Sequence, residues 1–146
     1  MGVLILITLS IVGFLVAGSF VDTLPREYRQ RPCMGAMWRR RFPVASKQTI
    51  RQFLFFFAET FAIRERRALL FGPDDKLLAI YRARYPSQLT PDALEFETLA
   101  QQLQKQHRII LSSFWHDDLT LGELFIKFSA AQLETQTNIS SNEWTM

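Results

Sequence analysis

The sequence has little of what enzymes and metal sites are built from: one cysteine and two histidines among 146 residues. Cys33 alone cannot form an intramolecular disulfide, and no paired Cys/His spacing suits a zinc module. There is also no glycine-rich phosphate loop, no Ser/His/Asp set and no carboxylate pair at a useful spacing. The sequence therefore predicts no catalysis, no metal and no cofactor.

Disorder and a multidomain organisation are also excluded. The chain is 48% hydrophobic and 13% aromatic, a composition far from that of disordered proteins. Its length leaves room for one domain of ordinary size. We therefore expect one folded domain, together with any segment that lies outside it.

Charged side chains are missing from residues 1–21, which are mostly Val, Leu, Ile and Phe. An apolar helix of about 20 residues, rising ~1.5 Å per residue, spans the hydrocarbon core of a bilayer. The segment thus predicts a single transmembrane anchor. The competing interpretation is a cleaved signal peptide, because the small residues Ala17, Gly18 and Ser19 suit a signal peptidase. No basic residue precedes the apolar run, and this favours the uncleaved anchor.

Positive charge is concentrated directly after this segment. Residues 22–47 contain seven basic and two acidic residues, whereas residues 48–146 contain ten basic and twelve acidic residues. A local basic tract suits a membrane surface better than a nucleic-acid face, and the positive-inside rule then places the C-terminal side in the cytoplasm. Residues 22–46, with three prolines, predict a juxtamembrane linker. Within it we expect a membrane-surface element consisting of Trp38, Arg39, Arg40 and Arg41, although these arginines could equally serve only to fix the topology.

Residues 47–133 predict an all-α domain, because apolar residues recur there at helical spacing. The first expected elements are a helix over 47–65 capped by Ser46 and a helix from about Leu77 to Tyr85. A third helix is opened by Thr90-Pro91-Asp92 and is followed by an apolar connection over 109–115. The last helix runs from the capping box Thr120-Leu121-Gly122-Glu123 through Leu133. Residues 134–146 lack periodicity and predict a flexible tail.

Two short motifs occur in the order known from one protein family. Asp92-Ala93-Leu94 opens one helix, and Thr120-Leu121-Gly122-Glu123-Leu124 opens the last. These resemble the D-S-L and T-[VL]-G-[DE]-L motifs of the acyl carrier protein domain over residues 47–131. The chain is most similar to small bacterial proteins that share this pattern without the serine. The resemblance implies a four-helix bundle and, with the anchor, a place in the bacterial inner membrane.

Alanine stands where the carrier serine would be. Ala93 has no oxygen to which a phosphopantetheine arm could be attached, so the resemblance implies a carrier-like fold without the carrier cofactor. It leaves a protein-binding role for the start of this helix, at Asp92, Leu94, Glu95 and Glu97. We therefore expect a membrane-anchored, non-catalytic interaction or adaptor module that binds an unidentified protein partner.

Two alternatives remain open at this point. The chain could be a genuine acyl carrier in lipid or acyl metabolism that uses another serine. It could also be a small regulatory subunit of a membrane complex that binds through its transmembrane helix, where Gly13, Ala17 and Gly18 permit close helix approach.

Overall fold

The computed structural model describes residues 24–86 and 94–142. The predicted anchor over residues 1–21 lies outside these ranges. Within them the regular elements are helices, and the sole extended pairing is one antiparallel bridge between Lys76 and Thr120. This confirms the prediction of an all-α domain. None of the helices in the described ranges combines the length and the apolar character that a membrane crossing needs.

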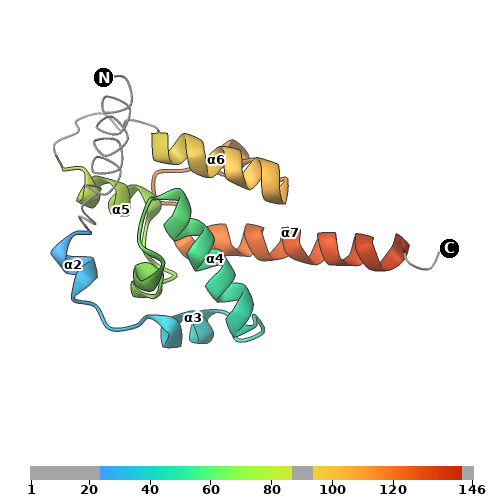
Figure 1. Ribbon diagram of the computed structural model, residues 1–146, viewed down its shortest axis with the longest axis horizontal. Coiled ribbons are helices and arrows are strands. Elements are labelled where there is room, and N and C mark those ends of the chain that lie inside the picture. Colours follow the sequence, from blue (N-terminus) through green and yellow to red (C-terminus); the bar gives the residue numbers. More distant parts are fainter. Residues whose placement is uncertain (1–23, 87–93, 143–146) are drawn as a thin grey trace, which may run out of the picture.

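Figure 1 shows how the helical elements are arranged. They are α2 (Arg26–Arg29), α3 (Gly35–Arg41), α4 (Lys47–Thr60), the 3₁₀ helix η1 (Glu65–Leu70), α5 (Leu77–Arg84), α6 (Leu94–His107), the 3₁₀ helix η2 (Leu111–Ser113) and α7 (Leu121–Asn142). Helices α4, α6 and α7 pack against one another, and η1 packs on α4 and α2. The start of α6, expected at Thr90-Pro91-Asp92, lies outside the described residues.

Phe53, Phe57 and Phe61 recur at helical spacing along α4 and its C-cap, and this aromatic stripe forms the centre of the core, as the apolar spacing predicts. The side chains of Phe53, Phe57 and Phe61 are fully buried. Phe53 contacts Phe125 and Phe128 of α7 with ring centroids 5.4 and 5.3 Å apart, in edge-to-face geometry. Such pairs add about 0.5–1.5 kcal/mol beyond the burial of their area. The stripe is therefore packing surface between helices rather than an aromatic ligand pocket.

Helix α4 begins as predicted but ends earlier. The Ser46 hydroxyl accepts a hydrogen bond from the Thr49 N–H at 3.0 Å, which confirms the N-cap. The helix stops at Thr60 rather than at 65, because Ala62 adopts a φ of 50°. The Ile63 N–H then donates to the Ala58 carbonyl at 2.7 Å, closing a Schellman turn. An alanine in this position gives no sequence signal for a helix end, since glycine is the usual marker.

Helix α7 opens with the predicted capping box. The Thr120 N–H donates to Glu123 Oε2 at 2.8 Å, and the Glu123 N–H donates to Thr120 Oγ1 at 3.2 Å. The flexible tail predicted from residue 134 is wrong as far as Asn142, because the helix continues to that residue. The hydroxyls of Thr135 and Thr137 donate to carbonyls four residues earlier, at 3.0 and 2.9 Å. Figure 1 shows this end of α7 extending past the other helices.

The turn over residues 72–76 holds the first turn of α7 in place. Backbone hydrogen bonds run from the Gly122 N–H to the Pro73 carbonyl at 2.7 Å and from the Leu121 N–H to the Asp75 carbonyl at 2.9 Å. Such short bonds require the two backbones to approach closely. A Cβ on Gly122 would lie 2.9 Å from the Pro73 carbonyl oxygen. The turn leaves no space for a side chain at position 122, and this contact is a physical reason for the glycine that the carrier-like motif does not supply.

Candidate binding surfaces

The start of α6, where the sequence predicts partner binding, is accessible in its described part. The Leu94 side chain is 65% exposed, and Glu97 is also exposed. Glu95 is half-buried and accepts a hydrogen bond from the Tyr85 hydroxyl. Asp92 and Ala93, the other members of the predicted site, lie outside the described residues. An exposed leucine beside an exposed carboxylate is therefore what this end of α6 offers to a partner.

Glu95 has a structural role that the sequence did not reveal. Burial and the hydrogen bond to Glu95 raise the pKa of Tyr85 to about 12, so the tyrosine stays a donor at all ordinary pH values. The bond ties α6 to the end of α5 across ten residues of sequence. Changes at Glu95 therefore disturb the fold as well as any binding, and Leu94 and Glu97 are the better probes of the surface.

Trp38 is not a membrane-surface residue, and its expected place at the headgroup level is wrong. Its side chain is fully buried, and Nε1 donates to the Phe71 carbonyl at 2.8 Å. The ring packs against Phe42 and Phe125, with centroids 5.7 and 5.5 Å apart. The core supplies both an apolar surface and an acceptor, so the indole needs no interfacial environment. The spacing of Met34, Trp38 and Phe42 at four-residue intervals is the signal for an inward helix face that the basic context obscured.

The segment over residues 22–46 is likewise more than a linker. Leu24, Tyr28 and Trp38 belong to the hydrophobic core, so the described part of this segment is built into the domain. Arg31 Nη1 contacts both carboxylate oxygens of Asp75 at 2.8 Å, and its guanidinium lies 4.4 Å from the centre of the Tyr28 ring. The domain boundary predicted at residue 47 therefore lies too late in the chain.

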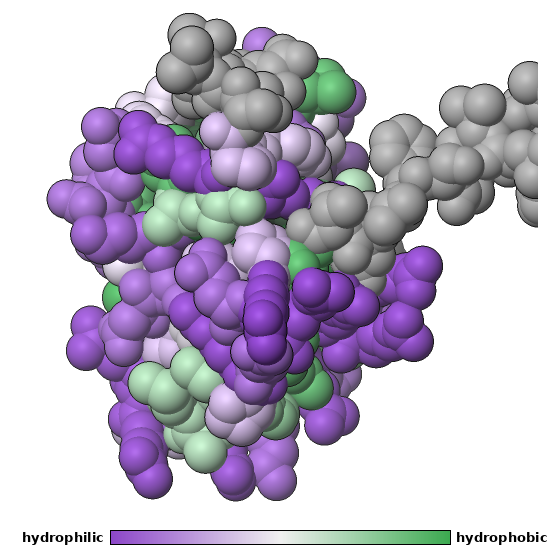
Figure 2. All heavy atoms as spheres, turned by 90° about the vertical axis from the view of Figure 1, so that its left-hand side faces the viewer, coloured by the Kyte–Doolittle hydropathy of each residue, from purple (hydrophilic) through white to green (hydrophobic). Residues whose placement is uncertain are grey.

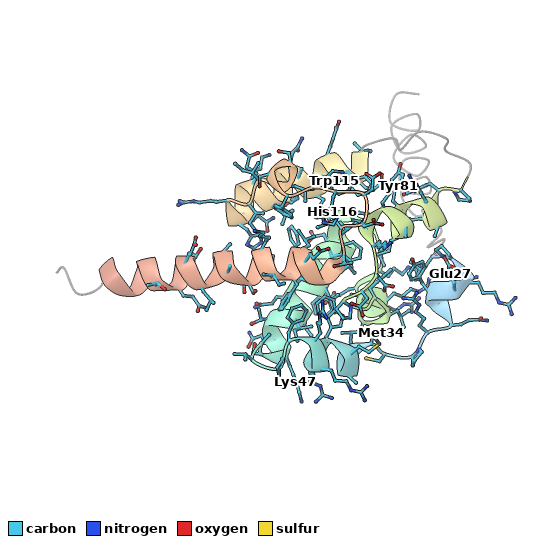
Figure 3. All side chains as sticks on the ribbon, turned by 180° about the vertical axis from the view of Figure 1, so that it is seen from behind. Glu27, Met34, Lys47, Tyr81, Trp115 and His116 are labelled. Carbon is cyan, nitrogen blue, oxygen red and sulfur yellow. The ribbon has the colours of Figure 1, made fainter. Side chains whose placement is uncertain are left out.

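The three arginines of α3 do face outward, as the sequence predicts for a surface element. Arg39, Arg40 and Arg41 are all exposed. Arg39 lies beside a hollow of about 380 Å³ between α3, the start of α4 and η1, which is also lined by Lys47 and Arg51. Figure 3 places Lys47 at the outer edge of the molecule, beside α3. The face that carries α2, seen in Figure 2, is dominated by hydrophilic side chains with small apolar patches.

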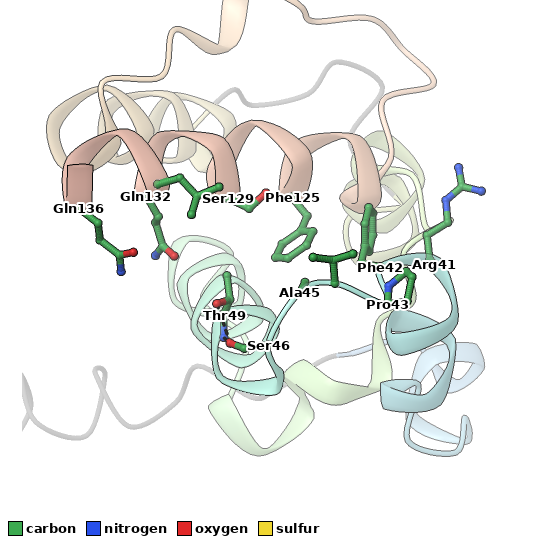
Figure 4. A pocket seen from close by; sticks show the side chains of 12 residues that line it. Arg41, Phe42, Pro43, Ala45, Ser46, Thr49, Phe125, Ser129, Gln132 and Gln136 are labelled. Carbon is green, nitrogen blue, oxygen red and sulfur yellow. Dashed lines mark hydrogen bonds between the residues drawn. The ribbon is translucent and has the colours of Figure 1, made fainter. Parts of the chain in front are cut away.

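A second hollow, of about 520 Å³, lies between the α3–α4 loop and the middle of α7 (Figure 4). Phe42, Ala45 and Phe125 form its apolar wall, and Ser46, Thr49, Gln132 and Gln136 add polar groups. Its volume falls in the range of small-molecule sites. Among the described residues, Arg41 is the only charged one that lines it, so these residues provide no cluster of titratable groups for acid–base chemistry.

Asp118 and His116, in the α6–α7 connection, have structural partners. Lys76 pairs with Asp118 at 2.7 Å, and the His116 imidazole lies 3.5 Å from the Glu123 carboxylate that closes the capping box. Figure 3 shows His116 in this connection, next to Trp115. Across residues 24–86 and 94–142, no three His, Cys, Asp or Glu side chains come together as a metal site would require.

Three comparisons with known proteins gave no match: no family model, no curated protein and no solved structure resembles the chain closely enough to be counted. The likeness to the acyl carrier protein domain therefore rests on the two motifs and their order alone.

Proposed function

We propose that this chain is a membrane-anchored, non-catalytic helical module that binds a protein partner through the start of α6. The observation that carries the proposal is the exposure of Leu94, 65%, beside the exposed Glu97. A large apolar side chain at the end of a helix, next to acidic groups, suits a partner surface that offers an apolar hollow rimmed by Lys or Arg. The partner's chemistry is thus a basic, partly apolar protein surface.

Membrane attachment gives such a module its affinity. The apolar residues 1–21 would confine the domain to the membrane plane, which raises its effective concentration for a partner on the same surface. A small docking surface of modest intrinsic affinity is then sufficient to keep the partner bound. Ala93 excludes the carrier reaction at that position, because a methyl group has no atom that could accept a phosphopantetheine.

A double substitution that removes the apolar side chain and reverses the charge at the exposed positions tests the docking face. The full chain carrying Leu94→Ser and Glu97→Lys should lose its partner in cross-linking from native membranes. The matched control carries Gln104→Ser and Lys105→Glu, two exposed positions near the other end of the same helix. Equal amounts of cross-linked partner from both variants would contradict the proposed face.

The intact mass of the chain from the same membranes separates this proposal from a working carrier. The proposal expects the mass of the unmodified chain apart from ordinary N-terminal processing. An added phosphopantetheine on another serine would make the protein a carrier and overturn the non-catalytic assignment.

A further inference from the structure

The hollow between α3 and α4 brings together cations from two helices that the sequence does not show as a group. Arg39 comes from the last turn of α3, while Lys47 and Arg51 come from the first turns of α4. Gly35, Ile50 and Leu69 supply apolar lining between them. In the described part of the chain, none of the three cations forms an ion pair with an acidic side chain. The hollow is therefore an uncompensated positive site.

The N-terminus of α4 adds to this positive potential, whereas the C-terminal turn of α3, which carries Arg39, contributes partial negative charge. The N-terminus of an α-helix carries partial positive charge and normally attracts acidic side chains. The first turn of α4 has no acidic residue and begins with Lys47, so the helix end and the side chain carry the same sign of charge. An anion in the hollow would relieve this repulsion. Arginine is also suited to such a ligand, because the guanidinium binds phosphate oxygens through two parallel hydrogen bonds.

We propose that this hollow, the α3–α4 cationic site defined by Arg39, Lys47 and Arg51, binds the phosphate of an anionic phospholipid headgroup. The choice of lipid rests on where the charge is. Residues 26–51 contain eight basic and one acidic residue and follow directly on the apolar segment, whereas the remainder of the domain is slightly acidic. A local basic tract that follows an apolar run of membrane-spanning length is typical of leaflet binding. A nucleic-acid face would also be a basic patch, so the choice of a lipid rests on the uncharged apolar run over residues 1–21 that precedes these cations.

The inference rests on the membrane location in the proposed function, but not on partner docking at α6. A failure of the lipid test would leave the cross-linking result at Leu94 and Glu97 untouched, and a failure of the docking test would leave lipid binding untouched. The two proposals are therefore separately refutable.

The chain carries its own reporter for this site. Cys33 is the only cysteine in the sequence, is exposed, and lines the same hollow. A lipid headgroup seated there should slow the reaction of the thiol with a maleimide. The measurement uses the full chain in nanodiscs, whose two faces are both accessible, with phosphatidylcholine alone or with added phosphatidylglycerol.

We expect labelling at least severalfold slower in the anionic nanodiscs, with the slowing removed by high salt. The variant Arg39→Gln/Lys47→Gln/Arg51→Gln should lose the effect, since each cation near an anionic surface contributes roughly fivefold to binding. The control Arg66→Gln/Arg82→Gln/Lys105→Gln removes the same charge from exposed positions elsewhere and should behave as the unmodified chain. For each variant, the labelling rate in anionic nanodiscs is divided by its own rate in phosphatidylcholine nanodiscs. A change in the intrinsic reactivity of Cys33 therefore does not affect the comparison.

Three results would overturn the proposal. The first is an equal labelling rate in both lipid compositions. The second is equal slowing in the Arg39/Lys47/Arg51 variant, which would place the lipid contact elsewhere. The third is equally strong protection by inorganic phosphate, or by a single-stranded oligonucleotide, in phosphatidylcholine nanodiscs; the site would then take free phosphate or nucleic acid rather than a lipid headgroup.

Discussion

Replacing Gly122 with alanine should destabilise the domain, even though alanine is normally the better helix residue. The added Cβ would lie 2.9 Å from the Pro73 carbonyl oxygen and 3.5 Å from Cζ of Phe42. The first distance is well inside ordinary contact, which begins near 3.5 Å for non-bonded heavy atoms. The obstructing atom is backbone and accepts the 2.7 Å hydrogen bond from the Gly122 N–H, so it cannot move away without breaking that bond.

The magnitude follows from two opposing terms. Overpacking of this kind costs about 1–3 kcal/mol, while alanine gains at most about 1 kcal/mol over glycine in helix propensity. Because the obstructing atom is a hydrogen-bonded backbone oxygen, the upper part of the overpacking range applies, about 2–3 kcal/mol, and the net loss in the free energy of unfolding is about 1–2 kcal/mol. The loss would be larger if the neighbouring bond from the Leu121 N–H to the Asp75 carbonyl also lengthened.

Gly35→Ala is the matched control, because Gly35 also lies in the first turn of a helix. Among the described residues, its added Cβ would meet only the Cys33 sulfur, at 3.5 Å, which is an ordinary contact. This variant should be unchanged or slightly more stable. Both variants are compared by urea unfolding of the full chain in detergent, followed by tryptophan fluorescence. A Gly122→Ala variant as stable as Gly35→Ala would refute the close approach of the turn and α7.

Two further predictions concern the ends of helices α4 and α6. Ala62→Gly should stabilise the domain by about 0.5–1 kcal/mol in the same urea assay, because Ala62 has a φ of 50° that glycine adopts without strain; a loss of stability would argue against the Schellman turn. Burial lowers the pKa of His107, whose ring packs against Phe56 and Phe128, so its neutral form is favoured in the folded state. The stabilisation that neutral His107 contributes is complete above pH ~6.5 and is lost as the pH falls through the lowered pKa of the folded state. The free energy of unfolding of His107→Leu should therefore depend less on pH in this range. An unchanged pH profile would contradict the burial of His107.

Local patterns predicted the helices because caps and apolar spacing act over a few residues. Ser46, the aromatic stripe of α4, and the Thr120–Glu123 capping box all appear in the structure as the sequence indicates. The end of α4 was mispredicted because alanine rather than glycine occupies the left-handed position. The apolar periodicity of α7 ends near Leu133, but the helix continues to Asn142. The helix is exposed over residues 133–137, and exposed helical turns need no apolar stripe.

Contacts between distant segments could not be predicted in the same way. Trp38 donates to a carbonyl 33 residues away, and Arg31 pairs with Asp75 across 44 residues. Such partners are fixed only when the tertiary fold brings them together. A tryptophan beside three arginines is typical of a membrane interface, so its burial reversed the interpretation of this segment. The same fold placed Arg39 beside Lys47 and Arg51, which produced a charged site that composition alone shows only as excess basicity.

Docking of a protein partner at the start of α6 can be tested by site-specific photo-cross-linking in native membranes. A photoreactive residue replaces either Leu94 or Val44, an apolar side chain that is 98% exposed in the α3–α4 loop. We expect a discrete protein adduct from position 94 that is absent from position 44 and disappears with Glu97→Lys. No adduct at position 94, or the same adduct from both positions, would contradict it.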